Sequence, residues 1–252
     1  MKSLNIYVNE GLADWGEDDT FNKKISKQTT KAVIKQEIIE WIQDNFVKVK
    51  KTKLKFDFST TPITVDYDGN IEFKENRDSL TNGMFQWGEV GGYFDCSYCQ
   101  KLKTLEGAPK KVGGNFYCRD CNSITSLKGA PEKVEGYFGC LYCISLKSLE
   151  GAPKKVGSDF NCGGCASLTT LEGAPKNVGK NFHCRDCKSL TSLEGSPMEV
   201  GGYFSCSYCP SLKTLKGAPE TVGGYFDCIE CGKKFTEEDV KKVSDVKGKI
   251  NC

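Results

Sequence analysis

The stretch VGGYFDCSYCQKLKTLEGAPKK, residues 90–111, decides the fold because it recurs every 22 residues. Further copies begin at Val112, Val134, Val156, Val178 and Val200, and a partial copy, VGGYFDCIECGKKF, occupies residues 222–235. A fixed period of about 20 to 50 residues indicates a solenoid, in which each unit buries its apolar face only by stacking on its neighbours. The sequence therefore predicts a solenoid over residues 90–235, built from six full repeats and one partial repeat.

The second repeat shows how one unit is expected to fold. Phe116 and Cys118 are two residues apart, so they point to one face of a short strand while Tyr117 points to the other. Gly129 and Pro131 then supply a turn. Because no window has helical periodicity, we expect a mainly β protein in which the strands form a parallel sheet along one side.

The repeat also resembles a known family. F-x-C-x-x-C followed by L-x-x-L is similar to the leucine-rich-repeat strand, with Phe116 and Cys118 at its inward leucine positions and Cys121 at its ladder position. Repeats of the type LTSLEGAPKKVGGYFDC, of which residues 102–118 are a variant, and the opening residues 2–10 most resemble leucine-rich-repeat-like proteins encoded by tailed bacteriophages of gut bacteria. The resemblance implies a solenoid and a phage origin, and it says little about activity.

Residues 1–89 lack the cysteine pairs and predict a small α+β module that caps the solenoid. An amphipathic stripe over residues 30–46 indicates a helix, and residues 10–28 are expected to be poorly ordered. Alternating runs at 54–58 and 63–67 predict strands, and Asp68-Gly69 predicts a hairpin turn into residues 71–73. Residues 79–89 are expected to be a degenerate half-repeat that docks this module.

Residues 236–252 are expected to cap the other end of the stack. Thr236 and Asp239 have the spacing of a capping box, which predicts a short helix. Val240, Val243 and Val246 are then available to cover the last coil. Both ends of the stack would be sealed, as a solenoid requires.

The 15 cysteines have three interpretations. Fourteen form C-x-x-C pairs, and adjacent pairs match a zinc spacing, with Cys206, Cys209, Cys228 and Cys231 the candidate ligands. However, zinc ligands converge to about 2.3 Å, whereas equivalent residues of stacked strands stay about 4.8 Å apart. We therefore favour free cysteines that fill the core, with no metal or other cofactor. Zinc binding and redox or disulfide chemistry remain alternatives.

Composition and charge exclude several functions. The net charge of +2 provides no global attraction to nucleic acid or anionic lipid. Without a signal peptide or a long apolar run, we expect no membrane association and a cytoplasmic location, which is the host cytoplasm if the protein is phage-encoded. The single histidine, His183, lies at a variable surface position with no evident catalytic partner. We therefore predict that the protein is not an enzyme.

The outward side of the predicted strands carries most of the tyrosines. Tyrosine and arginine are enriched at the centres of protein interfaces, so we predict a partner-binding surface there. Stacked tyrosines could instead only stabilise neighbouring strands. The predicted site, called the tyrosine face below, comprises Tyr93, Tyr98, Tyr117, Arg119, Tyr137, Leu141, Tyr142, Asp159, Asn161, Asn181, His183, Arg185, Tyr203, Tyr208 and Tyr225.

The fourth repeat has Gly163 and Gly164 in this face, which predicts a notch that accepts a loop or side chain of the partner. The function favoured is a protein-binding solenoid that engages a host protein, such as a defence or regulatory enzyme that it would inhibit. One alternative is a single-stranded nucleic-acid binder that stacks bases on tyrosines, although acidic residues in the same rows oppose it. A structural or virion-associated protein is the other.

Overall fold

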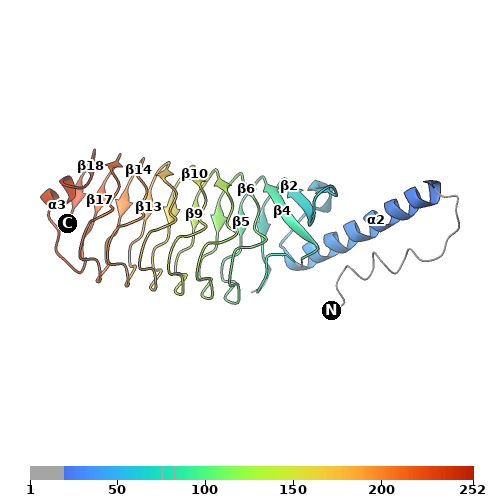
Figure 1. Ribbon diagram of the computed structural model, residues 1–252, viewed down its shortest axis with the longest axis horizontal. Helices are drawn as coiled ribbons and strands as arrows, with labels where there is room; N and C mark the ends of the chain where they lie inside the picture. Colours follow the sequence, from blue (N-terminus) through green and yellow to red (C-terminus); the bar gives the residue numbers. More distant parts are fainter. Residues whose placement is uncertain (1–19, 75–76, 82) are drawn as a thin grey trace.

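Each 22-residue repeat forms one coil of a β-solenoid, and the coils stack along a nearly straight axis (Figure 1). The structure is a computed structural model in which residues 20–74, 77–81 and 83–252 are described. Most strands are two residues long, and within the solenoid neighbouring coils pair in parallel and in register. The predicted mainly β solenoid with short parallel strands and a C-terminal helix is confirmed.

Each coil contributes a strand to two sheets, whereas a single sheet was expected. The ten-stranded sheet has the order β1 (Leu54–Asp57), β2 (Ile63–Tyr67), β4 (Phe85–Val90), β6 (Lys111–Val112), β8 (Lys133–Val134), β10 (Lys155–Val156), β12 (Asn177–Val178), β14 (Glu199–Val200), β16 (Thr221–Val222) and β18 (Asp245–Val246). The nine-stranded sheet comprises β3 (Ile71–Glu72), β5 (Phe94–Asp95), β7 (Phe116–Tyr117), β9 (Phe138–Gly139), β11 (Phe160–Asn161), β13 (Phe182–His183), β15 (Phe204–Ser205), β17 (Phe226–Asp227) and β19 (Ile250–Asn251). The Gly-Gly pair is the corner between the two strands of a coil.

Glycine is required where coils approach closely. Gly129 has a φ of +89°, and a Cβ added there would overlap the backbone around Glu106 in the preceding coil. A Cβ at the corner residue Gly113 would likewise overlap the carbonyl group of Gly91. These recurrent glycines therefore set the backbone path and the spacing between coils.

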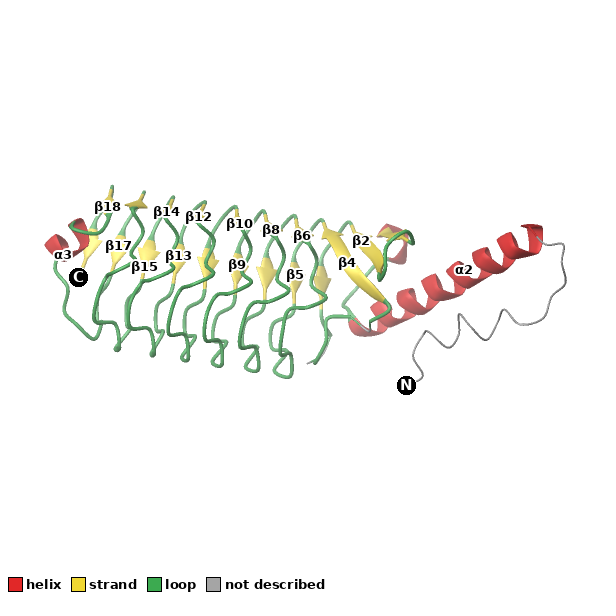
Figure 2. Cartoon of the chain, in the orientation of Figure 1, coloured by secondary structure: helices red, strands yellow, loops and turns green. Residues whose placement is uncertain are grey.

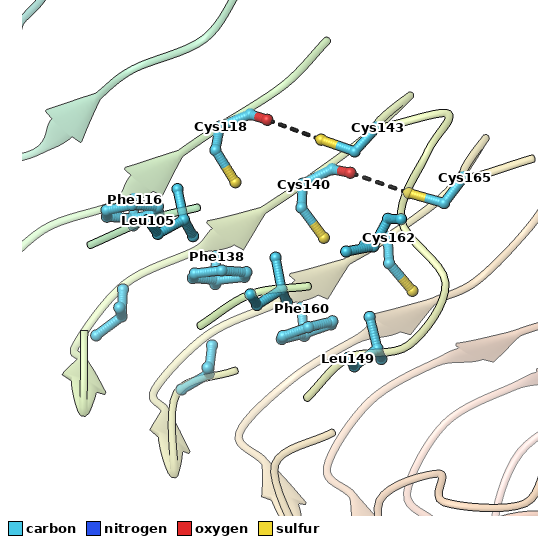
Figure 3. Close-up of a cluster of buried hydrophobic side chains, with 14 of the residues drawn as sticks. Leu105, Phe116, Cys118, Phe138, Cys140, Cys143, Leu149, Phe160, Cys162 and Cys165 are labelled. Carbon is cyan, nitrogen blue, oxygen red and sulfur yellow. Dashed lines mark hydrogen bonds between the residues drawn. The ribbon is translucent and has the colours of Figure 1, made fainter. Parts of the chain in front are cut away.

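The core is a column of phenylalanine rings that runs along the stack (Figure 3). Successive rings from Phe94 to Phe204 have centroids 5.1–5.6 Å apart and planes within 15° of each other. The consensus leucines, such as Leu105 and Leu149, are also fully buried beside this column. The apolar positions of every repeat therefore join into one continuous core.

The N-terminal end differs from the sequence prediction in two respects. Helix α2 (Thr20–Asn45) begins ten residues earlier than expected, so residues 20–28 are helical, while residues 10–19 lie outside the described residues. The antiparallel hairpin joins β1 to β2, and Asp68-Gly69 is not a hairpin turn. Instead, β2 pairs in parallel with β4 and β3 with β5, because Asp68-Gly69 forms the same corner as Gly-Gly in the repeats.

The helix covers this end through the predicted apolar stripe. Ile38 and Ile42 are fully buried, and the stripe residues Ile34 and Trp41 also pack against the core. The ring of Trp41 lies edge-on to Phe85, with centroids 5.6 Å apart. The 3₁₀ turn η1 (Lys51–Lys53) then leads from the helix region into β1.

The C-terminal end contains the predicted helix and one further coil. In helix α3 (Glu237–Lys241), the hydroxyl of Thr236 accepts from the amide of Asp239, and the Asp239 carboxylate accepts from the amide of Thr236. Val240 is buried, but Val243 is 39% exposed and so does not cover the stack as expected. After α3, strands β18 and β19 extend both sheets, and Figure 2 shows β18 beside α3 at the end of the solenoid.

Candidate functional site

The paired cysteines lie inside the coils, where their thiols donate to backbone carbonyl groups. The second cysteine of a pair reaches back to the first cysteine of the preceding coil, as Cys143 does to the Cys118 carbonyl at 3.1 Å (Figure 3). Equivalent bonds of 3.1–3.4 Å recur along the stack, from Cys121, Cys165, Cys187, Cys209 and Cys231. The second cysteine thus links adjacent coils.

Several of the buried thiols are poor nucleophiles. Burial raises the pKa of Cys99 to about 11, and burial also raises the pKa of Cys162 and Cys184. A thiol must ionise before it attacks a substrate or binds a metal. These cysteines therefore suit a role in packing and hydrogen bonding.

Three of the four candidate zinc ligands make separate contacts. Cys209 donates to the Cys184 carbonyl and Cys231 to the Cys206 carbonyl, while the sulfur of Cys228 faces Cys252. Within the described residues, no group of three or more His, Cys, Asp or Glu side chains is placed to hold a metal ion. The geometry therefore supports the core-filling interpretation of these thiols.

The tyrosine face lies over the nine-stranded sheet and the turn that follows it. Tyr98, Tyr142 and Tyr208 occupy the position between the two cysteines of their repeats and are 57%, 43% and 43% exposed. Each has a left-handed backbone, with φ between 56° and 63°. Among residues with side chains such a backbone favours Asn and Asp, and a large aromatic residue there is strained. These tyrosines therefore sit in a conformation that the equivalent Gly164 adopts without that strain.

The remaining tyrosines form two groups on the strands. Tyr93, Tyr117 and Tyr137 are half-buried and contact one another, with centroid distances of 6.4 and 5.5 Å. Tyr203 and Tyr225 are 48% and 46% exposed and stack at 4.9 Å. Tyr203 and Tyr225 therefore stack across neighbouring coils, whereas Tyr117 contacts Tyr93 edge-on and Tyr137 at a tilt.

Two Arg–Asp pairs lie between the tyrosines of this face, in the repeats where an aspartate takes the position of Tyr98. The Nε atom of Arg119 lies 2.9 Å from the Asp120 carboxylate, and its guanidinium group lies 5.2 Å from the centre of the Tyr142 ring. Arg185 has the same arrangement with Asp186 and Tyr208, at 3.1 and 5.7 Å. Each arginine is therefore held in place and neutralised locally by its acidic neighbour.

An open hollow of about 600 Å³ lies between these groups in the first three repeats. It is lined by Asp95, Ser97, Tyr98, Tyr117, Arg119, Tyr137 and Leu141. Asp95 and Ser97 were not among the predicted site residues, although they occupy the same outward rows as Tyr117 and Arg119. The hollow has an aromatic wall, one acidic group and one arginine that is already paired.

The predicted notch at the fourth repeat is filled by its neighbours, so that prediction is wrong. The ring of Tyr142 lies against Gly164, and Gly163 is buried beside Arg185. The Oδ1 atom of Asn161 accepts from the Gly163 amide at 2.9 Å. Larger side chains from the adjacent repeats lean into the space that the glycines leave.

Two predicted site residues have a structural role. Oδ1 of Asp159 accepts from the Asn181 amide at 2.9 Å, and Oδ1 of Asn181 accepts from the Tyr203 amide at 2.7 Å. These bonds join successive coils at the corner of the stack. His183 is half-buried, and burial lowers its pKa, so it is neutral near pH 7.

No protein-family model matches the chain, and comparisons with curated proteins and with solved structures also find no match. No helix in the described part of the chain has the length and apolar character needed to cross a membrane.

Proposed function

We propose that the protein is a non-enzymatic binding protein that engages another protein through the tyrosine face. The resemblance to phage-encoded repeat proteins suggests that the partner is a protein of the bacterial host, such as a defence or regulatory enzyme. The proposal depends mainly on one observation: Tyr98, Tyr142 and Tyr208 are exposed and hold a left-handed backbone.

The physical argument concerns the cost of this arrangement. A left-handed backbone at a residue with a side chain costs about 1 kcal/mol or more, and such strain is found mostly at functional sites. Gly164, at the equivalent position of the fourth repeat, shows that this position accepts glycine, which removes the strain. The packing of Tyr142 and Tyr208 beside arginine offsets part of the cost, but Tyr98 remains 57% exposed at the rim of the hollow.

The electrostatics favour a protein partner over a nucleic acid. Arg119 and Arg185 are each paired with an aspartate, and Asp95 lines the hollow. Binding of single strands needs a positively charged groove beside the aromatic side chains. An interface of mixed charge with exposed aromatic anchors is typical of protein recognition.

The test is a triple variant, Tyr98→Gly, Tyr142→Gly and Tyr208→Gly. Glycine relieves the backbone strain while it loosens the unfolded chain, so we expect the free energy of unfolding to change by less than about 1 kcal/mol per site. Affinity capture from host extract with the wild-type protein identifies a partner. We expect its dissociation constant to rise by at least about 100-fold for the variant, because exposed aromatic anchors dominate interfaces.

A matched control changes three exposed lysines outside the tyrosine face, Lys110→Ala, Lys154→Ala and Lys176→Ala. We expect this control to bind like the wild-type protein. If the triple glycine variant keeps full affinity while the lysine control loses it, the tyrosine face is not the binding surface. If nuclease treatment abolishes capture, the partner is a nucleic acid and the proposal is wrong.

A further inference from the structure

The C-terminal end of the stack brings together two cysteines from successive coils. Cys228 follows β17 and Cys252 follows β19, and these strands pair in parallel with Asp227 opposite Asn251. The amide of Cys228 donates to the Asn251 carbonyl at 2.8 Å. Residues in register on neighbouring strands have Cα atoms about 4.8 Å apart, within the range of about 4.4–6.8 Å that a disulfide spans. The two sulfur atoms are 2.7 Å apart.

The same register exists between the first cysteines of the inner coils, but their surroundings differ. The thiol of Cys118 donates to the Gly139 carbonyl, that of Cys184 donates to the Ser205 carbonyl, and both cysteines are buried. Cys252 is the one exposed cysteine of the chain. It also borders an open hollow of about 620 Å³ at the end of the stack. A dissolved oxidant therefore reaches Cys252 most readily, whereas the first cysteines of the inner coils are enclosed.

We propose that Cys228 and Cys252 form a reversible disulfide that closes the C-terminal end of the solenoid. The oxidant is a small-molecule disulfide such as glutathione disulfide. The Cys252 thiolate attacks it, forms a mixed disulfide and releases one glutathione thiolate. The Cys228 thiolate then attacks the sulfur of Cys252 and releases the second glutathione. The protein loses two hydrogens and two electrons, and one oxidised glutathione becomes two reduced ones.

The bond would act on the part of the stack that is least supported. The last coil has a neighbour on one side only, and the terminal units of a solenoid open first. The closed loop runs from Cys228 to Cys252 and so contains α3, β18 and β19. Oxidation would therefore hold the whole final coil against the preceding one, and reduction would release it.

The test uses the full-length protein in buffers of reduced and oxidised glutathione. In the oxidised buffer we expect the intact mass to fall by about 2 Da, and we expect two of the 15 thiols to resist alkylation once the protein is unfolded. We also expect hydrogen exchange in β19 and α3 to slow at least about tenfold, as a crosslink limits local opening.

Three variants identify the bond. Cys252→Ser should keep every remaining thiol reactive after unfolding, whereas Cys228→Ser should stop at the mixed disulfide of Cys252 with glutathione and lose one thiol instead of two. Cys231→Ser is the matched control, because Cys231 lies in the same pair as Cys228 but donates to the Cys206 carbonyl, and it should still lose two thiols. The proposal is overturned if wild-type protein that was held folded in the oxidised buffer and then unfolded still alkylates all 15 thiols, or if Cys228→Ser forms the crosslink through Cys231.

Discussion

Replacing Phe160 with alanine tests whether the phenylalanine column holds the coils together. Its ring is fully buried between Phe138 and Phe182, at centroid distances of 5.1 and 5.2 Å. Loss of a buried phenylalanine side chain costs about 3–5 kcal/mol, and each aromatic neighbour adds about 0.5–1.5 kcal/mol beyond burial. With stacked rings on both sides, we expect Phe160→Ala to lower the free energy of unfolding by about 5 kcal/mol.

The matched control is Phe226→Ala near the C-terminal end. Phe226 is equally buried, but its ring neighbours Phe204 on one side and pairs with Ile250 on the other. With one aromatic neighbour, this variant should lose about 1 kcal/mol less than Phe160→Ala.

Urea unfolding followed by circular dichroism measures both changes. In a stack coupled only between neighbours, the central variant should also split unfolding into two transitions. If Phe226→Ala costs as much as Phe160→Ala, or Phe160→Ala costs less than about 2 kcal/mol, the column does not couple the coils as argued.

Three further predictions concern the turns, the cap and the thiols. Gly151→Ala should cost at least about 2 kcal/mol in urea unfolding, because Gly151 has a φ of +88° and the new Cβ would lie 2.5 Å from the backbone of the preceding coil; Gly83→Ala, with φ +84° and open space, should cost only the backbone strain. Thr236→Ala removes the cap of α3 and should lower the free energy of opening the last coil by about 1 kcal/mol, so hydrogen exchange there should become faster. Unchanged exchange would contradict the role of the cap. Burial raises the pKa of thiols such as Cys99 from 9.0 to about 11, so these thiols lose their protons at lower pH in the unfolded state than in the folded state. The free energy of unfolding should therefore stay constant from pH 7 to 8 and fall above pH 9. A free energy of unfolding that rises between pH 9 and 10 would contradict the raised pKa of these thiols.

The repeat made the solenoid predictable, but it did not reveal the second sheet. Lys111-Val112 is a strand of two residues, too short for the alternation of apolar and polar residues by which strands are recognised. It becomes a strand only because Glu89-Val90 of the coil before and Lys133-Val134 of the coil after lie beside it. Stacking therefore creates a structure that the local sequence does not specify.

The final coil was missed because it lacks the C-x-x-C signature. Val246, Ile250 and Cys252 have the same internal spacing as Val222, Phe226 and Cys228, but they follow after 24 residues instead of 22 because α3 lies between. This spacing was the available signal. It places Cys252 in the repeat pattern, whereas the cysteine pairs alone leave it outside.

The repeat predicted which residues belong to the tyrosine face, but it did not predict where that face is hollow. A row assigns each residue to a face, but the shape of the face depends on which way long side chains lean. Tyr142 and Arg185 cover the two glycines of the fourth repeat, and the hollow opens instead beside Tyr98. Rotamer choice between neighbouring coils decides this, and no single repeat contains that information.

The identical joints between coils have an evolutionary consequence. Val134 pairs with Val112 in the same register as Val156 pairs with Val134, so the joint between two coils, meaning their paired strands, can replace another such joint. An in-frame duplication or deletion of one 22-residue unit in the gene would leave every remaining joint intact. It would shift all residues beyond it by one coil, about 4.8 Å. Recombination between repeats could thus change the spacing of surface groups in fixed steps while the core stays the same.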